Sequence, residues 1–144
     1  LAESDGGGVQ VQGETTVRDS RVVNNSLNAT SETGLALASG GGLFNLSASL
    51  TLERTVVTAN SASATGAGGF NLGGGIGNVL VGGGPPELTL TDSVVTANRL
   101  DASDGVLSQG GGLYTADPFS GQPFPVTITR TVIAGNKPDQ CSGC

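Results

Sequence analysis

The sequence predicts an all-β protein that forms one parallel β-solenoid domain over residues 1–144. Two observations lead to this prediction: Gly triplets recur at a nearly constant interval, and the stretch "TLTDSVVTAN" recurs with small changes as "TLERTVVTAN" and "TITRTVIAGN". A repeat of this length cannot bury its apolar face alone, so successive units must stack and share a core. We expect about four coils of roughly three strands each. We expect no substantial helix, because β-branched residues, Ser, Thr and Gly interrupt every candidate helical period.

The Gly triplets set the approximate limits of the repeats. They begin at Gly6, Gly40, Gly73 and Gly110, at spacings of 34, 33 and 37 residues. The four repeats therefore span approximately residues 6–39, 40–72, 73–109 and 110–144. A phosphate-binding loop would need a Lys and a Ser or Thr after the glycines and a helix that starts there, and neither is present. We interpret the triplets as corner residues.

Aligning the repeats gives columns of equivalent residues, which become ladders along the axis at a spacing of about 4.8 Å. Three aliphatic columns are expected to point inward and indicate three faces. Their members are Val17, Leu52, Leu90 and Ile128; Val22, Val57, Val95 and Ile133; and Val9, Leu43, Ile76 and Leu113.

A polar column follows the second aliphatic column and is predicted to form one corner of the coil. Its members are Asn25, Asn60, Asn98 and Asn136. Asn tolerates a left-handed backbone, and its amide can bond to the Asn above and below. We therefore expect a structural ladder of stacked amides.

A charged column alternates in sign from coil to coil. Its members are Asp19, Arg54, Asp92 and Arg130. Opposite charges on adjacent strands favour stacking by about 0.2–1 kcal/mol per pair. A second copy stacked head to tail would place its Asp19 above Arg130, so the alternation would continue across the joint.

The composition argues against several classes of function. The chain has 25 Gly, no His and no Trp, and 6 basic against 12 acidic residues give a net charge of −6. Without a basic stripe, nucleic acid is not an expected partner. No apolar run approaches the roughly 20 residues of a membrane span. The chain opens with "LAESD", without a Met or a signal sequence, which is typical of a mature, processed product.

The two cysteines, Cys141 and Cys144, lie at the C-terminus in "DQCSGC". Zinc would need two further ligands, and the chain offers no His and no other Cys. A redox pair of the thioredoxin kind would follow a βαβ pattern, which is absent here. We expect a disulfide of a secreted protein, closed either within the pair or between subunits.

The chain resembles the right-handed parallel β-helix repeats of bacterial surface proteins, related to the polymorphic outer-membrane-protein repeat and to pectate-lyase-like folds. The segments that carry the resemblance are "GGGLFN", "GGGLYT", "LTLTDSVVTAN", "VTITRTVIAGN" and the closing "NKPDQCSGC". The resemblance implies right-handed coils and an extracellular or bacterial cell-surface location. It leaves the function open, because the same coil serves adhesins, enzymes and fibres.

Three functions can be compared on the sequence. A polysaccharide-active enzyme is disfavoured, because no base and cation converge; we assign no catalytic, cofactor or metal residues, and we interpret Asp101 and Asp104 as a solvated turn. A binding module, such as an adhesin or passenger-domain fragment with a carbohydrate or cell-surface ligand, would use an exposed aromatic face. Phe44 and Tyr114 are the candidates for it, and Phe119 belongs to a Pro-rich loop.

The third function is structural. Neither terminus carries an obvious cap, and bare solenoid ends associate through their edge strands. The sequence therefore favours a subunit that self-assembles head to tail into a filament, with the surface-protein fragment as the alternative.

Overall fold

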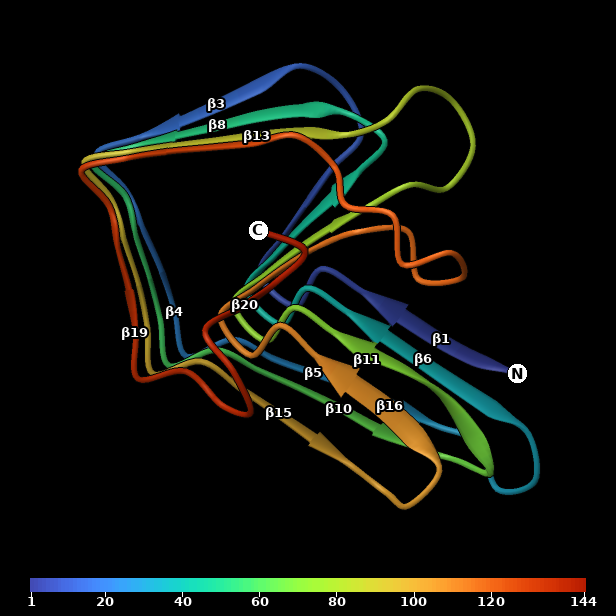
Figure 1. Cartoon of the computed structure of the whole chain (residues 1–144). Helices are drawn as coiled ribbons and strands as arrows, with labels where there is room; N and C mark the ends of the chain where they lie inside the picture. The colour runs from blue at the N-terminus through green and yellow to red at the C-terminus, as the bar shows by residue number, and fades with distance from the viewer.

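The structure, a computed structural model, describes all residues from Leu1 to Cys144. It is all-β and contains no helix, and its strands stack into five parallel sheets around a common axis (Figure 1). No helix is present that could cross a membrane. The predicted β-solenoid of about four coils is confirmed.

The five sheets are named A to E, each in its order of pairing. Sheet A contains β1 (Ala2–Asp5), β6 (Leu35–Ser39), β11 (Gly68–Leu72) and β16 (Val106–Gln109). Sheet B contains β2 (Val9–Val11), β7 (Leu43–Leu46), β12 (Ile76–Val79), β17 (Leu113–Thr115) and β20 (Cys141–Ser142). Sheet C contains β3 (Thr15–Arg18), β8 (Ser49–Glu53), β13 (Glu87–Thr91) and β18 (Val126–Thr129). Sheet D contains β4 (Arg21–Val23), β9 (Val56–Thr58), β14 (Val94–Thr96) and β19 (Val132–Ala134). Sheet E contains β5 (Ser26–Thr30), β10 (Ser61–Thr65) and β15 (Arg99–Ala102).

A complete coil has five strands, where the sequence predicted roughly three. Two causes explain the difference. Each apparent strand such as "LTLTDSVVTAN" is split by a residue with positive φ, Asp92 in this copy, so one predicted strand becomes a strand of sheet C and a strand of sheet D. The segment between each Asn and the next Gly triplet forms the strands of sheets E and A, although it is rich in Ala and Ser, which give a weak strand signal.

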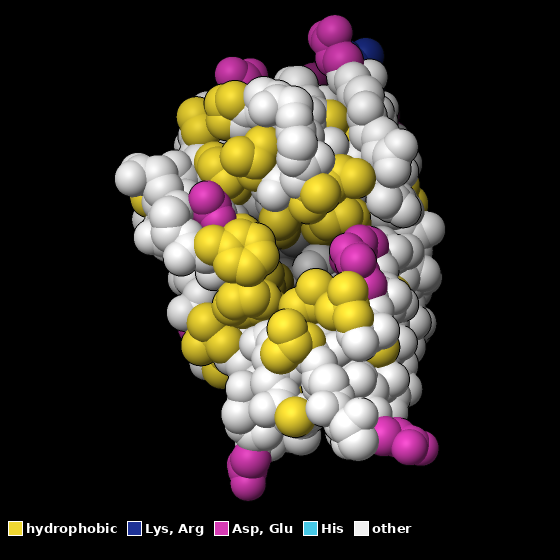
Figure 2. Space-filling model, turned by 90° about the vertical axis from the view of Figure 1, so that its right-hand side faces the viewer, with side chains coloured by type: hydrophobic (Ala, Val, Ile, Leu, Met, Phe, Trp, Pro, Cys, Tyr) yellow, Lys and Arg dark blue, Asp and Glu magenta, His cyan; other side chains and the backbone are white.

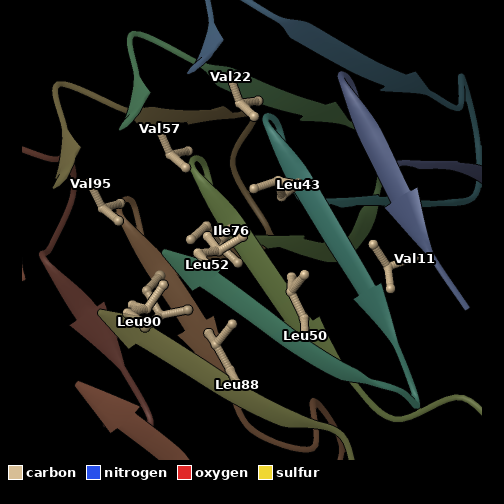
Figure 3. Close-up of a cluster of buried hydrophobic side chains, with 11 residues drawn as sticks. Val11, Val22, Leu43, Leu50, Leu52, Val57, Ile76, Leu88, Leu90 and Val95 are labelled. Carbon is tan, nitrogen blue, oxygen red and sulfur yellow. The ribbon is translucent and has the colours of Figure 1, made fainter. Parts of the chain in front are cut away.

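The coil has two lobes of unequal size, which Figure 1 shows in cross-section. Sheets B, C and D enclose the larger lobe, whose core consists of stacked Val, Leu and Ile side chains, and Figure 3 shows Val22, Val57 and Val95 in a row along it. Sheets E and A enclose the smaller lobe, which is filled mainly by Ala with Leu27 and Leu100. Small side chains let these two sheets lie close together, so the second lobe is thin.

The three predicted aliphatic columns are present in the expected register. Val17 pairs with Leu52, Leu52 with Leu90, and Leu90 with Ile128, and the other two columns stack in the same way. Leu52 and Leu90 are fully buried, whereas Ile128 on the last coil is 41% exposed. The core is therefore complete in the middle coils and uncovered at the last one.

The Gly triplets form the junction between the two lobes, as corner residues. The first glycine of each triplet has a positive φ of 66–72°, a region that glycine enters without steric cost. The second lies against the backbone of the next coil: a Cβ on Gly74 would be 2.5 Å from the carbonyl oxygen of Gly111. The third contacts the Asn column, and a Cβ on Gly75 would be 2.8 Å from Nδ2 of Asn98. Close approach of two corners therefore requires glycine.

The Asn column forms a continuous ladder of amides, as predicted. In each of its three steps, the Oδ1 of one Asn accepts the backbone N–H and the Nδ2 of the Asn one coil earlier, at 2.9–3.0 Å. The steps join Asn25 to Asn60, Asn60 to Asn98, and Asn98 to Asn136. Each of the last three side chains also donates from Nδ2 to a backbone carbonyl of sheet D. The ladder thus provides an acceptor for the N–H groups of Asn25, Asn60 and Asn98, which lie outside the strands and have no backbone carbonyl as partner.

The left-handed residues at this corner are not the column Asn residues themselves. They are the preceding residues, Asn24, Ala59, Ala97 and Gly135, with φ between 54° and 66°. The sequence expectation was therefore off by one position. The left-handed residue turns the chain, and the Asn that follows it points inward to reach the next coil.

Asn98→Ala should lower the free energy of unfolding by about 3 kcal/mol, because the backbone N–H and Nδ2 of Asn60 would lose their buried acceptor. Chemical denaturation measures this change. The matched control is Asn28→Ala, on an exposed part of β5, which should stay within about 0.5 kcal/mol of the parent. Equal losses in the two variants would contradict a stabilising role for the ladder.

Gly74→Ala should destabilise the chain by about 3 kcal/mol or more, because the added methyl group would overlap backbone of the neighbouring coil. The control is Gly84→Ala in the loop before β13, where a Cβ would have no atom within 4 Å. The unfolding midpoint of this control should match the parent. A stable Gly74→Ala variant would show that the coils can separate at this corner without loss.

Candidate functional site

The N-terminal end of the solenoid is an open edge. The first strand of each sheet, from β1 to β5, pairs with the second coil on one side only, so its outer N–H and C=O groups have no partner strand. The ladder of amides also begins there. Oδ1 of Asn25 accepts no hydrogen bond, although the Oδ1 of every later member does. This end therefore offers hydrogen-bonding groups in the pattern that another coil would use.

The charged corner consists of two separate ion pairs. Arg54 donates from Nε and an Nη to both carboxylate oxygens of Asp19, at 2.6 and 2.9 Å, and Arg130 does the same to Asp92, at 2.5 and 2.7 Å. These hydrogen bonds hold the pKa of both carboxyls below their usual value. All four residues have φ of 46–50°. The predicted column therefore stacks as two ion pairs, with Asp19 on the first coil and Arg130 on the last, and no ion pair joins Arg54 to Asp92.

The C-terminal end is partly covered by the tail, residues Lys137 to Cys144. Gln140 takes the position that a further Asn would have in the ladder: its Oε1 accepts the N–H and the Nδ2 of Asn136, at 3.0 and 3.1 Å, and its Nε2 donates to the carbonyl of Asn136 at 3.2 Å. The carboxylate of Asp139 accepts the backbone N–H of Gly111 at 2.8 Å. The tail therefore closes the donor end of the ladder of amides.

The tail also adds a fifth strand to sheet B. It forms no strand in sheets E and A, and β20 pairs along the outer edge of β17 (Figure 1). A disulfide joins Cys141 to Cys144, so the bridge closes within one chain. The expectation that neither end has a cap was wrong for this end. The signal for this cap in the sequence was weak, because Gln140 takes the place of the repeated Asn in a segment that does not match the repeat.

A third apolar cluster lies outside both lobes, in the angle between sheets A and B. It contains Phe44, Leu72, Val79, Tyr114 and Ala116. Phe44 and Tyr114 are only 1% and 2% exposed, so the prediction that they form an exposed aromatic face was wrong. Burial raises the pKa of the Tyr114 hydroxyl to about 12. Residues of the loops after β12 and β17 lie beside these rings: Ala116 belongs to the cluster, and Leu80 and Phe119 line the same hollow as Phe44. The repeat pattern did not predict these contacts.

A hollow remains in this angle, which we call the lateral groove. It has a volume of about 190 Å³ and is mostly apolar, with Leu37 and Phe70 from sheet A on one side and Val79 to Val81 on the other. Phe119 from the loop after β17 overhangs it, edge-on to Phe70 with ring centroids 5.6 Å apart. Figure 2 shows this hollow, with apolar side chains on both walls and carboxylates beside it. The repeat columns alone did not reveal the groove.

Two carboxylates line the lateral groove at the first coil, Glu3 and Asp5. Asp5 is half-buried, and burial, followed by the charge of Glu3, raises its pKa from 3.8 to about 6. Neither carboxylate takes part in an ion pair. The ion pairs of the structure join other carboxylates to four of the five arginines. The acidic end of the groove therefore lacks a cationic partner.

The remaining acidic residues do not form a metal centre. No group of three His, Cys, Asp or Glu side chains in the structure could hold a metal ion together. Asp104 lies in an exposed turn, as interpreted, but Asp101 does not: it belongs to strand β15, where it lies 3.1 Å from Nε of Arg99 in an exposed ion pair.

Comparisons with models of protein families, with curated proteins and with solved structures found no match for this chain. The resemblance noted in the sequence is therefore confirmed only at the level of the fold, a parallel β-helix repeat.

Asp5 should make the folded chain less stable as the pH rises from about 4 to 6, because its folded pKa is raised and the folded state binds more protons in this window. Asp5→Asn should flatten the dependence, as measured by chemical denaturation at several pH values. The lowered pKa values of Asp19 and Asp92 act in the opposite sense and below this window. The control Asp104→Asn should keep the pH dependence of the parent. If the stability of Asp5→Asn depends on pH as steeply as that of the parent and of this control, the assignment is contradicted.

Proposed function

We propose that this chain is a non-enzymatic structural protein whose coil ends stack copy on copy, head to tail, into a filament. The observation that carries the proposal is the open N-terminal edge, where five strands and the acceptor of Asn25 have no partner. Each added coil satisfies backbone groups along every sheet, which makes such an edge prone to association.

The charged corner supports a head-to-tail orientation. Asp19 lies on the first coil and Arg130 on the fourth, so a second copy in continuous register brings opposite charges together at the joint. Stacking of two N-terminal ends would form no such pair, because the first coil carries Asp19 and no arginine in this column. The exposed side chains of the last coil, Ile128 and Val132, would gain cover in the same joint.

The tail competes with this joint. In continuous register, the incoming β2 would pair with the outer edge of β17, which β20 already occupies. Gln140 likewise occupies the donors of Asn136 that would reach the incoming Asn25. We therefore infer that stacking proceeds when the tail moves aside, and that the tail limits how readily copies associate.

An extracellular location at a bacterial surface completes the proposal. The disulfide favours an oxidising compartment, and the resemblance to bacterial surface repeats favours that setting. A non-enzymatic function is supported by the arrangement of the charged side chains, because four arginines are engaged in exposed ion pairs and no base and cation face one another across a cleft.

Arg130→Asp and Asp19→Arg should each weaken stacking at low salt, because each variant places like charges at its own joint. An equal mixture of the two variants should stack again, since opposite charges then meet at every mixed joint. Sedimentation velocity and electron microscopy of the parent, each variant and the mixture measure this. The control Arg54→Asp breaks an equivalent ion pair within the chain but leaves both end residues unchanged, so it should stack more readily than Arg130→Asp.

Gln140→Ala tests the tail in the same assays. Loss of its contacts with Asn136 should free the end of the ladder and increase stacking over the parent. A parent and a Gln140→Ala variant that both remain monomeric at high concentration would refute the filament.

A further inference from the structure

We propose that the lateral groove binds a small organic cation, an ammonium group carried on an apolar body, lying along the solenoid axis. This inference does not rest on filament formation, because the groove opens on the side of the solenoid (Figure 2), although its acidic end belongs to β1 of the first coil.

The groove changes from acidic to apolar along the axis. Two outward columns of sheet A face it: Glu3 pairs with Leu37 and Leu37 with Phe70, while Asp5 pairs with Ser39 and Ser39 with Leu72. The first coil therefore supplies two carboxylates, and the next two coils supply mainly apolar side chains. Adjacent coils are about 4.8 Å apart, so the distance from acid to aromatic matches a short, elongated ligand.

The acidic end is complementary to a positive charge. Glu3 and Asp5 have no cationic partner, and they are the only titratable side chains that line the groove. Asp5 is half-buried beside apolar groups, where an ion pair is screened less than at an open surface. An ammonium group placed there would relieve the repulsion between the two carboxylates.

The other end is complementary to an apolar body. Phe119 is 86% exposed and Val81 is 61% exposed, although both line the groove. Phe119 stands edge-on to Phe70, so the two rings leave apolar surface open to the hollow. A ligand in the hollow beside these rings would bury apolar area that water now contacts, and an aromatic ring also attracts a nearby cation.

The lining favours an apolar cation over a sugar. Apart from the two carboxylates, Ser39 is the only lining residue whose side chain can form hydrogen bonds, and a sugar would leave most of its hydroxyl groups unpaired. The volume of about 190 Å³ lies below the roughly 300–1,000 Å³ of pockets for drug-sized ligands, which matches a small amine.

Three probes with one apolar body and different charges test the proposal: 2-phenylethylamine, 2-phenylethanol and 3-phenylpropionate. Titrations of the full chain followed by NMR should give the ammonium probe an affinity at least about tenfold higher than the carboxylate probe, with the alcohol between them. The shifted amide signals should include those of Asp5 and Phe119. The affinity for the ammonium probe should fall between about pH 7.5 and 5, as Asp5 takes up its proton.

Matched variants separate the two ends of the groove. The double variant Glu3→Gln with Asp5→Asn should lose the preference for the ammonium probe over the other two. Phe119→Ser should lower the affinities for the ammonium and alcohol probes by a similar factor. The distant control Asp104→Asn should bind like the parent. If the double variant does not fold, Asp5→Asn alone should reduce the preference and remove the pH dependence.

The proposal is overturned if the ammonium probe does not bind at about 10 mM, which exceeds the dissociation constant of a weak specific ligand. Equal affinities for the three probes, or shifts confined to the charged corner at Asp19 and Arg54, would also overturn it. Since none of these assays depends on stacking, failure here would leave the filament proposal untouched, and the reverse also holds.

Discussion

The structure depends on one constraint: every corner of a coil must satisfy its buried backbone groups through the same corner of the next coil. At the Gly triplets, backbone carbonyls of the next coil accept these N–H groups directly, and at two other corners side chains accept some of them. At the Asn corner, each N–H donates to the Oδ1 one coil later. At the charged corner, Thr55 and Ser93 donate their N–H groups to the hydroxyls of Ser93 and Thr131 in the same direction. Both ladders require identical geometry in every coil, which is why the sequence repeats.

The same constraint explains the unusual backbone of the corners. A left-handed residue precedes each of these side chains, and in most cases it is not glycine but Asp, Arg, Ala or Asn. Such a conformation costs about 1–2 kcal/mol for a residue with a Cβ. The hydrogen bonds of the following residue and the exposed ion pairs offset this cost. The chain uses glycine where two backbones meet, at the triplets that contact the Asn ladder.

Repetition gives the two ends and the side of the molecule different properties. A ladder that is satisfied only by the next coil leaves an open acceptor at its first member and open donors at its last. In this chain Gln140 satisfies the donors, while Asn25 still presents the acceptor. The outer surface along the side of the solenoid does not require equivalent residues in successive coils to be alike. The outward residues of sheet A vary freely from coil to coil, so carboxylates in one coil and aromatic or aliphatic groups in the next produce the polarity of the lateral groove.

The sequence by itself determined the coil number, the stacking register of its main columns and the Asn and charge ladders, because equivalent residues in a stacked repeat must lie above one another. Only the tertiary structure decided the rest. The five-strand, two-lobed coil follows from left-handed corners and from an Ala-rich segment whose strand signal is weak. The burial of Phe44 and Tyr114, the groove beneath Phe119 and the cover provided by Gln140 depend on loops and a tail that occur once. Features without repetition leave no periodic signal, because their positions are set by packing between distant segments.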